Sequence, residues 1–342
     1  MSAARVSHLL ASAAFAAAAP ALAEAPRVVA DIAPIHSIAA AVMAGVGAPA
    51  LIVPPGVSEH DYALRPSEAT ALEAADLVVW VGPALTPWLE EAVAALAPDA
   101  LLLTLQAAQG VRLLPVREGG PFEGHDEDHA DDEDHAESDT DDHPAEAVEA
   151  GHGDNQAARA GDKHDADAGA TDPHFWLDPQ GGTEIAAALS GALSEVDPAN
   201  AAAYAANAAT FGAEMEALAA EIAEKVQPLR NQDYFVFHDA YQYFEDRFAL
   251  PAAGSVALND AEPPRAPRIA EIRERFTNES IDCVFAEPQF EPKLIATLIE
   301  GTTTRTGTLD PLGAGLEPGP GLYPALLRGL ADDLVACLDP QS

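Results

Sequence analysis

The sequence predicts an α/β fold with two domains, each with a parallel β-sheet flanked by helices. Three observations predict this class. The chain has 342 residues, which suggests two domains of roughly 150 residues each. Short β-like runs alternate with alanine-rich helical stretches, and such alternation is typical of parallel sheets. Between two such regions lies a helical pattern that is long enough to run along both domains.

The first alternating region contains four apolar runs separated by helical segments. Gly45 ends the first helical segment, and Pro54 stops the second apolar run. Pro66 suits the first position of a helix, where its missing N–H costs nothing. We predict strands at residues 27–32, 50–53, 77–80 and 101–104, and helices at residues 35–44, 66–74 and 85–96.

Two helical stretches precede the second alternating region. Residues 181–196 predict a helix that breaks at Asp197 and Pro198, and residues 199–226 predict a second one. With about 28 residues at 1.5 Å each, this second helix is about 40 Å long. We predict the remaining strands at residues 234–237, 283–286 and 307–309, and helices at residues 269–276 and 292–300.

The N-terminus has the pattern of a secretory signal peptide. Arg5 precedes the short apolar run 9–19, and the small residues Ala21 and Ala23 form a cleavage pattern. We expect cleavage near Ala23 and a periplasmic protein, because no later stretch reaches the ~18 apolar residues of a membrane span. The expected division is a signal peptide (1–23), an N-terminal domain (24–180), connecting helices (181–228) and a C-terminal domain (229–342).

Residues 118–172 form an acidic, histidine-rich insertion in the N-terminal domain. They include 20 Asp and Glu residues, six histidines and two basic residues. Such a segment cannot bury enough apolar surface to offset its ordering entropy, so we expect disorder. Imidazoles among carboxylates favour divalent transition metals, whereas a solvated acidic linker is the alternative. The candidate weak metal ligands are His125, His129, His135, His143, His152 and His164.

The chain contains only two cysteines, Cys283 and Cys337. Export to an oxidising compartment favours a disulfide between them. The bond would close a loop of about 50 residues, worth roughly 4 kcal/mol in the chain-entropy model. Two buried free thiols are the alternative.

Four histidines lie outside the insertion and the signal peptide. His60 follows the second predicted strand, His238 follows the strand 234–237, and His174 lies where the insertion rejoins the fold. Ligands of open α/β sheets bind outside the carboxyl ends of strands, so these positions suit a shared site. Three imidazoles with one carboxylate or water form a tetrahedral zinc site. The alternative is separate surface or capping histidines, and His36 fits that alternative best, at a helix N-terminus or beside the cleft.

Five sequence motifs resemble those of the periplasmic zinc receptors of ABC-type zinc importers, within the wider family of metal receptors and adhesins. The motifs occur in the same order and cover essentially the whole mature chain. They are Pro55-Gly-x-x-Glu-His-Asp-Tyr-x-Leu-Arg-Pro-Ser67, Asp172-Pro-His-x-Trp-Leu-Asp-Pro179, Phe237-His-Asp-Ala-Tyr-x-Tyr-Phe244, Phe285-Ala-Glu-Pro-Gln-Phe290 and Leu309-Asp-Pro-Leu-Gly313.

The resemblance implies two α/β domains joined by one rigid helix, with the metal in the cleft between them. It assigns the zinc ligands to His60, His174 and His238, with Glu59 or water as the fourth. It also implies a disulfide in the C-terminal domain and a His-rich insertion in the position of residues 118–172. The expected partners are Zn²⁺ and the membrane permease of a zinc importer, and the expected state is a monomer.

Related manganese and iron receptors resemble this chain but carry a carboxylate where His238 stands, and they use an aspartate equivalent to Asp310. Carboxylate oxygens suit manganese, whereas imidazole suits zinc, so the histidine favours zinc. Asp310 is then expected to form a structural turn or to fix a histidine tautomer, with metal ligation as its alternative role.

Other function classes fit the sequence less well. The net charge of −39 repels nucleic acid and anionic lipid and attracts cations. A zinc hydrolase would also use three histidines, but no His-Glu-x-x-His or Gly-x-Ser-x-Gly motif is present, so we expect no enzyme. A zinc buffer or chaperone would rely on the insertion alone and would have no need of a folded α/β remainder.

Overall fold

The computed structural model describes residues 24–60, 62–117, 122, 170–257, 264–290 and 293–339. The predicted signal peptide lies outside these residues, and so do the six histidines of the insertion. Among the described helices, none combines the length and apolarity needed to cross a membrane.

The first sheet is parallel and has the strand order β2-β1-β3-β4. The two central strands, β1 and β3, are fully buried, whereas the edge strands β2 and β4 are partly exposed. The strands are β1 (Val28–Ala30), β2 (Ala50–Leu51), β3 (Leu77–Trp80) and β4 (Leu101–Thr104). The connecting helices are α1 (Ala33–Val42), α2 (Pro66–Glu73) and α3 (Pro87–Leu96), and each has proline in its first two positions.

The second sheet repeats this arrangement, with parallel strands in the order β6-β5-β7-β8. The strands are β5 (Tyr234–Val236), β6 (Gly254–Ser255), β7 (Cys283–Ala286) and β8 (Arg305–Thr308). The helices are α6 (Gln242–Phe248), α7 (Ala266–Asn278), α8 (Lys293–Leu298) and α9 (Leu322–Leu338).

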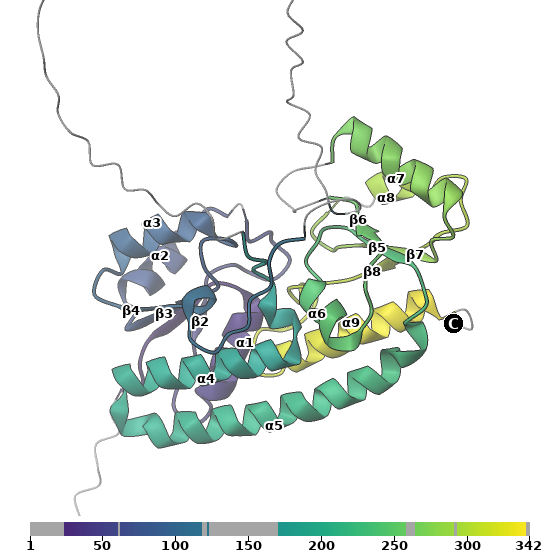
Figure 1. The fold of residues 1–342 in the computed structure, drawn as a ribbon. Helices are drawn as coiled ribbons and strands as arrows, with labels where there is room; N and C mark the ends of the chain where they lie inside the picture. Colours follow the sequence, from purple (N-terminus) through teal and green to yellow (C-terminus); the bar gives the residue numbers. More distant parts are fainter. Residues whose placement is uncertain are drawn as a thin grey trace, which may run out of the picture.

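Two helices, α4 (Pro179–Val196) and α5 (Ala201–Val226), connect the sheets. Helix α5 runs beneath both halves of the molecule and packs against α1, α4, α6 and α9 (Figure 1). One continuous apolar core includes Val79 of the first sheet, Phe211 of α5 and Phe285 of the second sheet. A packed interior resists deformation, so this shared core holds the two halves together. The predicted fold, with two parallel sheets and a long connecting helix, is confirmed.

Among the described α-helices and strands, α6, β6 and α9 were not predicted from the sequence. The strand β6 has only two residues, Gly254 and Ser255, and therefore lacks an apolar run. Helix α9 packs on β8, on α5 and on α1 of the first half, so it joins the two halves as α5 does. Cys337 of α9 forms a disulfide with Cys283 of β7. This predicted disulfide is therefore confirmed.

Candidate metal centre

Three histidines from three separate segments converge where the two halves of the molecule meet. His60 lies in the loop after β2, and His238 lies two residues after the end of β5. His174 immediately precedes the short 3₁₀ helix Phe175–Leu177. In both sheets the strand order reverses at the central pair, and ligand sites of α/β sheets form beyond the carboxyl ends of such strands.

Three side chains in this region lie close enough together to coordinate one metal ion. Candidate ligand atoms of Glu59, His60 and His174 all lie within 4.8 Å of one another. His238 is not part of that group of three, but its ring centroid lies 5.3 Å from the ring centroid of His174. The ring centroids of His60 and His174 are 6.5 Å apart. The structure therefore places Glu59, His60 and His174 close together, with His238 beside His174.

A carboxylate fixes the orientation of His174. Nδ1 of His174 and its backbone N–H both lie in hydrogen-bond range of Oδ1 of Asp172, at 2.7 and 2.9 Å. Both residues are buried. Because a carboxylate oxygen accepts, this geometry favours the tautomer with the proton on Nδ1 and the lone pair on Nε2. Nε2 of His174 is buried and has no hydrogen-bond partner among the described residues.

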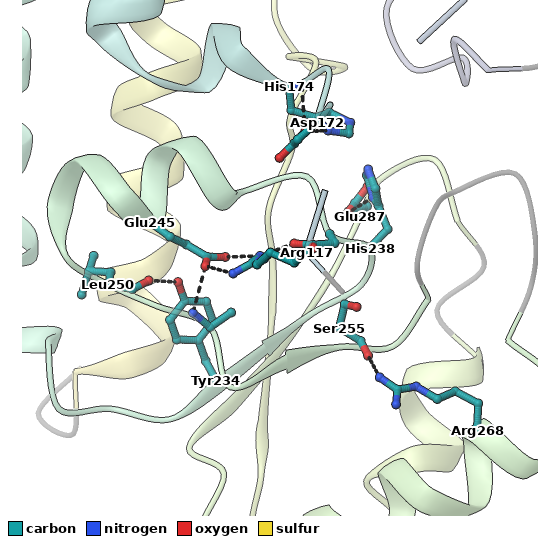
Figure 2. A network of polar contacts seen from close by, with 12 residues as sticks. Arg117, Asp172, His174, Tyr234, His238, Glu245, Leu250, Ser255, Arg268 and Glu287 are labelled. Carbon is teal, nitrogen blue, oxygen red and sulfur yellow. Dashed lines mark hydrogen bonds and ion pairs between the residues drawn. The ribbon is translucent and has the colours of Figure 1, made fainter. Parts of the chain in front are cut away.

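His238 is held in the same way from the second sheet. Its Nδ1 lies 2.7 Å from Oε1 of Glu287, and both side chains are almost completely buried. Glu287 directly follows β7, the parallel neighbour of β5, so both side chains extend from the same edge of the sheet. Figure 2 shows the His174–Asp172 and His238–Glu287 pairs facing the same region. A carboxylate behind each imidazole raises its basicity as a metal ligand.

Glu59 places a carboxyl group beside His60. Its side chain is buried, and Oε1 lies 3.8 Å from Nε2 of His60. The indole N–H of Trp88 donates to the backbone carbonyl of Glu59 at 2.8 Å and so attaches this loop to α3. The centre thus combines imidazole nitrogens with one adjacent carboxylate, a donor set that suits zinc.

Asp310 and His36 have structural partners of their own. Oδ1 of Asp310 accepts the N–H groups of Leu312 and Gly313, and Oδ2 accepts the N–H of Ala314. These bonds close a turn over residues 310–314. His36 lies in the first turn of α1 and is hydrogen-bonded at Nε2 to the carbonyl of Pro49, at 3.1 Å.

Sequence reasoning assigned no role to Asp172 or Glu287. Glu287 could have been found, because it follows the predicted strand 283–286 as His238 follows the strand 234–237. Parallel strands place their carboxyl ends at one edge, so a neighbouring carboxylate was a natural partner for the imidazole.

A buried acid, Asp31, directly follows β1. Its two carboxylate oxygens accept the N–H groups of Ile32 and Val81, at 2.8 and 2.7 Å. Burial raises the pKa of Asp31 from 3.8 to about 7, and nearby Glu59 adds to the rise, although the N–H groups of Val81 and Ile32 oppose it. The folded protein therefore binds a proton here that the unfolded chain releases at much lower pH.

We expect Asp31→Asn to change how the stability of the metal-free protein depends on pH. With a raised folded-state pKa, the contribution of Asp31 is fully present below about pH 4 and is lost as the pH rises to about 7. The slope of unfolding free energy between about pH 5 and 7 should become less negative in the variant. Urea unfolding with a chelator present, at several pH values, measures this slope.

Asp76→Asn is the matched control for this measurement. The hydrogen bond from the exposed side chain of Arg27 lowers the pKa of Asp76, so its contribution is lost only as the pH falls through the acid range. The slope between about pH 5 and 7 should therefore stay as in the unaltered protein. An equal change in both variants would mean that Asp31 is not the source of the slope.

Comparison with known proteins identifies one family and several relatives. The family model described as zinc-uptake complex component A, periplasmic, matches residues 28–337. The high-affinity zinc uptake system protein ZnuA of Brucella abortus (strain 2308) is 44% identical over 312 residues, which cover 91% of each chain. The protein of the same name from Paracoccus denitrificans (strain Pd 1222) is 41% identical over 333 residues, covering 97% of this chain and 98% of that one.

Solved structures share the fold at lower sequence identity. A crystal structure of ZnuA matches with a TM-score of 0.71 and 21% identity over 92% of this chain and 100% of that one. A 138–173 deletion mutant of ZnuA with zinc bound matches with a TM-score of 0.66 and 21% identity, over 93% and 100%. FpvC from Pseudomonas aeruginosa in complex with Mn²⁺ has a TM-score of 0.69 and 18% identity, over 93% and 99%. These three likenesses concern the fold alone.

Proposed function

The chain belongs to the family of periplasmic zinc-uptake complex components, and from this premise we propose that it captures Zn²⁺ and delivers it to the permease of an ABC transporter. The relatives from Brucella abortus and Paracoccus denitrificans are named as high-affinity zinc uptake proteins. The family is one of substrate-binding receptors, and zinc is the cargo of this protein.

The cargo site that we propose consists of His60, His174 and His238, with Glu59 as the fourth ligand and water as its alternative. The observation that carries this proposal is the pair of buried carboxylates on Nδ1 of His174 and of His238. Each carboxylate leaves Nε2 as the nitrogen that can bind metal. We assign Asp310 to the supporting turn, because N–H groups already bind both of its oxygens.

The donor set supports zinc over manganese. Three of the four proposed ligands are imidazoles, which zinc accepts readily, whereas manganese prefers carboxylate and water oxygens. Competitive titration of the mature protein with zinc and manganese tests this selectivity. A tighter manganese site would favour a manganese or iron receptor instead.

We further propose a periplasmic monomer, matured by cleavage near Ala23, with domains at residues 24–180 and 229–342 and connecting helices at 181–228. The matching family is one of periplasmic proteins. Each proposed ligand binds the metal, and none is proposed as a catalytic acid, base or nucleophile. We therefore expect no turnover of esters or peptides in the presence of zinc.

The acidic insertion is proposed as an accessory that binds further zinc weakly through its six histidines. We expect that replacing residues 123–169 with a short Gly-Ser linker removes the weak sites and leaves the tight site within about threefold of its original affinity. The described partners of the primary site all lie outside the replaced segment. Counting bound zinc at two strengths of competing chelator separates the two kinds of site.

The same experiment distinguishes a receptor from a buffer. One zinc ion that survives the stronger chelator in both proteins supports a receptor with a site in the fold. If no zinc survives, or if the tight ion disappears with residues 123–169, the protein acts as a buffer through its insertion.

A further inference from the structure

The segment that precedes the insertion pairs with the last residues of the insertion, next to the metal centre. We call residues 112–117 and 170–172 the stem. The N–H of Val116 donates to the carbonyl of Ala170, and the N–H of Asp172 donates to the carbonyl of Leu114, each at 2.9 Å. The stem thus ends in Asp172, the residue whose carboxylate orients His174.

Arg117, on the stem, binds two carboxylates of the C-terminal half. Its Nε donates to Oδ2 of Asp239 at 3.0 Å, and its Nη1 donates to Oε2 of Glu245 at 2.6 Å. Its Nη2 bonds to the other oxygen of each carboxylate. Figure 2 shows Arg117 extended between Glu245 and the segment that carries His238. Asp239 directly follows His238 in the chain, so Arg117 holds the backbone beside a proposed zinc ligand.

This contact is well shielded from water. The side chain of Arg117 is 18% exposed, that of Asp239 9% and that of Glu245 3%. Burial alone would lower the pKa of Arg117, but the bonds to Asp239 and Glu245 raise it by more, so the net direction is upward. Removal of one partner from such a pair leaves a buried charge uncompensated.

A second arginine on the stem provides a natural comparison. Arg112 also reaches α6, where its Nη2 donates to Asp246 at 2.8 Å. These two side chains are 47% and 52% exposed, so their pairing contributes little. In the described hydrogen bonds and ion pairs, Arg112 makes no contact with Asp239, the residue that follows His238. Both arginines attach the stem to α6, but only Arg117 also contacts the residue next to His238. Substitution of each in turn therefore distinguishes the two effects.

Helix α6 is hydrogen-bonded both to the stem and to the segment that leads into β6. The hydroxyl of Tyr243 donates to the carbonyl of Asp172 at 2.9 Å and accepts the N–H of Leu114 at 2.7 Å. Glu245 also accepts the N–H of Ala252 at 3.1 Å, which ties α6 to the chain that leads into β6. The stem before His174 and the helix after His238 thus form one hydrogen-bonded unit.

We propose that Arg117 is a positioning residue of the metal site: through Asp239 and Glu245 it fixes His238 relative to His174 and thereby slows the release of zinc. This inference rests on the proposed zinc site. Outer partners of metal ligands typically contribute about 10- to 100-fold to affinity, and we expect about tenfold for Arg117, since it acts through the neighbour of a ligand.

The test measures the rate of zinc release into excess chelator by stopped flow, with the full mature chain. Arg117→Met removes the guanidinium and keeps the apolar stem of the side chain, and it should release zinc about tenfold faster. Arg117→Lys keeps one charge and should recover part of the loss. Arg112→Met, the matched control, should stay within about twofold of the unaltered protein, because its ion pair is exposed.

Co²⁺ provides a readout that a purely structural role would leave unchanged. Its visible absorption depends on the geometry of its ligands. We expect altered band positions or intensities in Arg117→Met and unaltered ones in Arg112→Met. If Arg117→Met fails to fold, Asp239→Asn, which removes the negative charge of one of its two partners, takes its place with the same expected direction.

The outcomes separate this inference from the function on which it rests. Equal release rates and equal Co²⁺ spectra in Arg117→Met and Arg112→Met would overturn the role of Arg117 while leaving the zinc site intact. Fast release from the unaltered protein would instead contradict the proposed zinc site itself.

Discussion

Replacement of His174 by alanine is expected to abolish tight zinc binding while the protein stays folded. The ring centroid of His174 lies 6.5 Å from that of His60 and 5.3 Å from that of His238, and its Nε2 has no described partner to compete with a metal. Loss of an outer partner typically lowers metal affinity by about 10- to 100-fold, and loss of a direct ligand should lower it by more. Titration calorimetry with a competing chelator measures the change.

The same measurement applies to His60→Ala and His238→Ala, for which we expect losses of similar size. His36→Ala is the matched control, because His36 is a partly buried histidine bonded to Pro49 and is not among the clustered ligands. Unchanged tight binding in any one of the three site variants would exclude that residue from the site.

Removal of the disulfide is expected to produce the largest loss of stability. Cys283 and Cys337 are buried and separated by 54 residues, and they join β7 to α9. In the chain-entropy model, a cross-link over such a loop contributes roughly 4 kcal/mol by constraining the unfolded chain. Urea unfolding of the metal-free Cys283→Ala, Cys337→Ala double variant under oxidising conditions should show a decrease of this size.

A reducing agent provides the control for this prediction. With both proteins reduced, the difference between them should shrink to the effect of two lost sulfur atoms on packing. Equal stability of the two proteins under oxidising conditions would contradict stabilisation through constraint of the unfolded chain.

Periodicity and breaker residues were sufficient to predict most of the fold. The apolar runs 77–80 and 283–286 coincide with β3 and β7, because buried parallel strands are continuous apolar segments. Helix α9 also carries a readable signal, since its buried residues Leu322, Leu326 and Leu330 recur at a spacing of four along one face. Strand β6 carries none, because two residues cannot show a period.

One contact of α9 could not have been predicted from a local pattern. Tyr323 is buried in the first turn of this helix, and its hydroxyl donates to the carbonyl of Trp176 at 2.6 Å. The two residues are 147 positions apart in the sequence. This bond joins α9 to the segment that follows His174, so the helix supports the metal centre through a partner that only the folded chain reveals.

The ligands of the candidate site could be predicted because each has a local signal. His60 and His238 follow predicted strands, and His174 lies where the insertion rejoins the fold. The supporting contacts have no such signal. Arg117 meets Asp239 and Glu245 across 122 and 128 residues of sequence, so only the folded arrangement of the two halves reveals the pairing.

The central claim is that one zinc ion binds tightly where His60, His174 and His238 converge. Crystals of the mature protein grown with one equivalent of zinc, measured at the zinc absorption edge, test it most directly. We predict one dominant anomalous peak with a ring nitrogen of each histidine at about 2.0–2.1 Å. A dominant peak elsewhere, with none between these three side chains, would contradict the account.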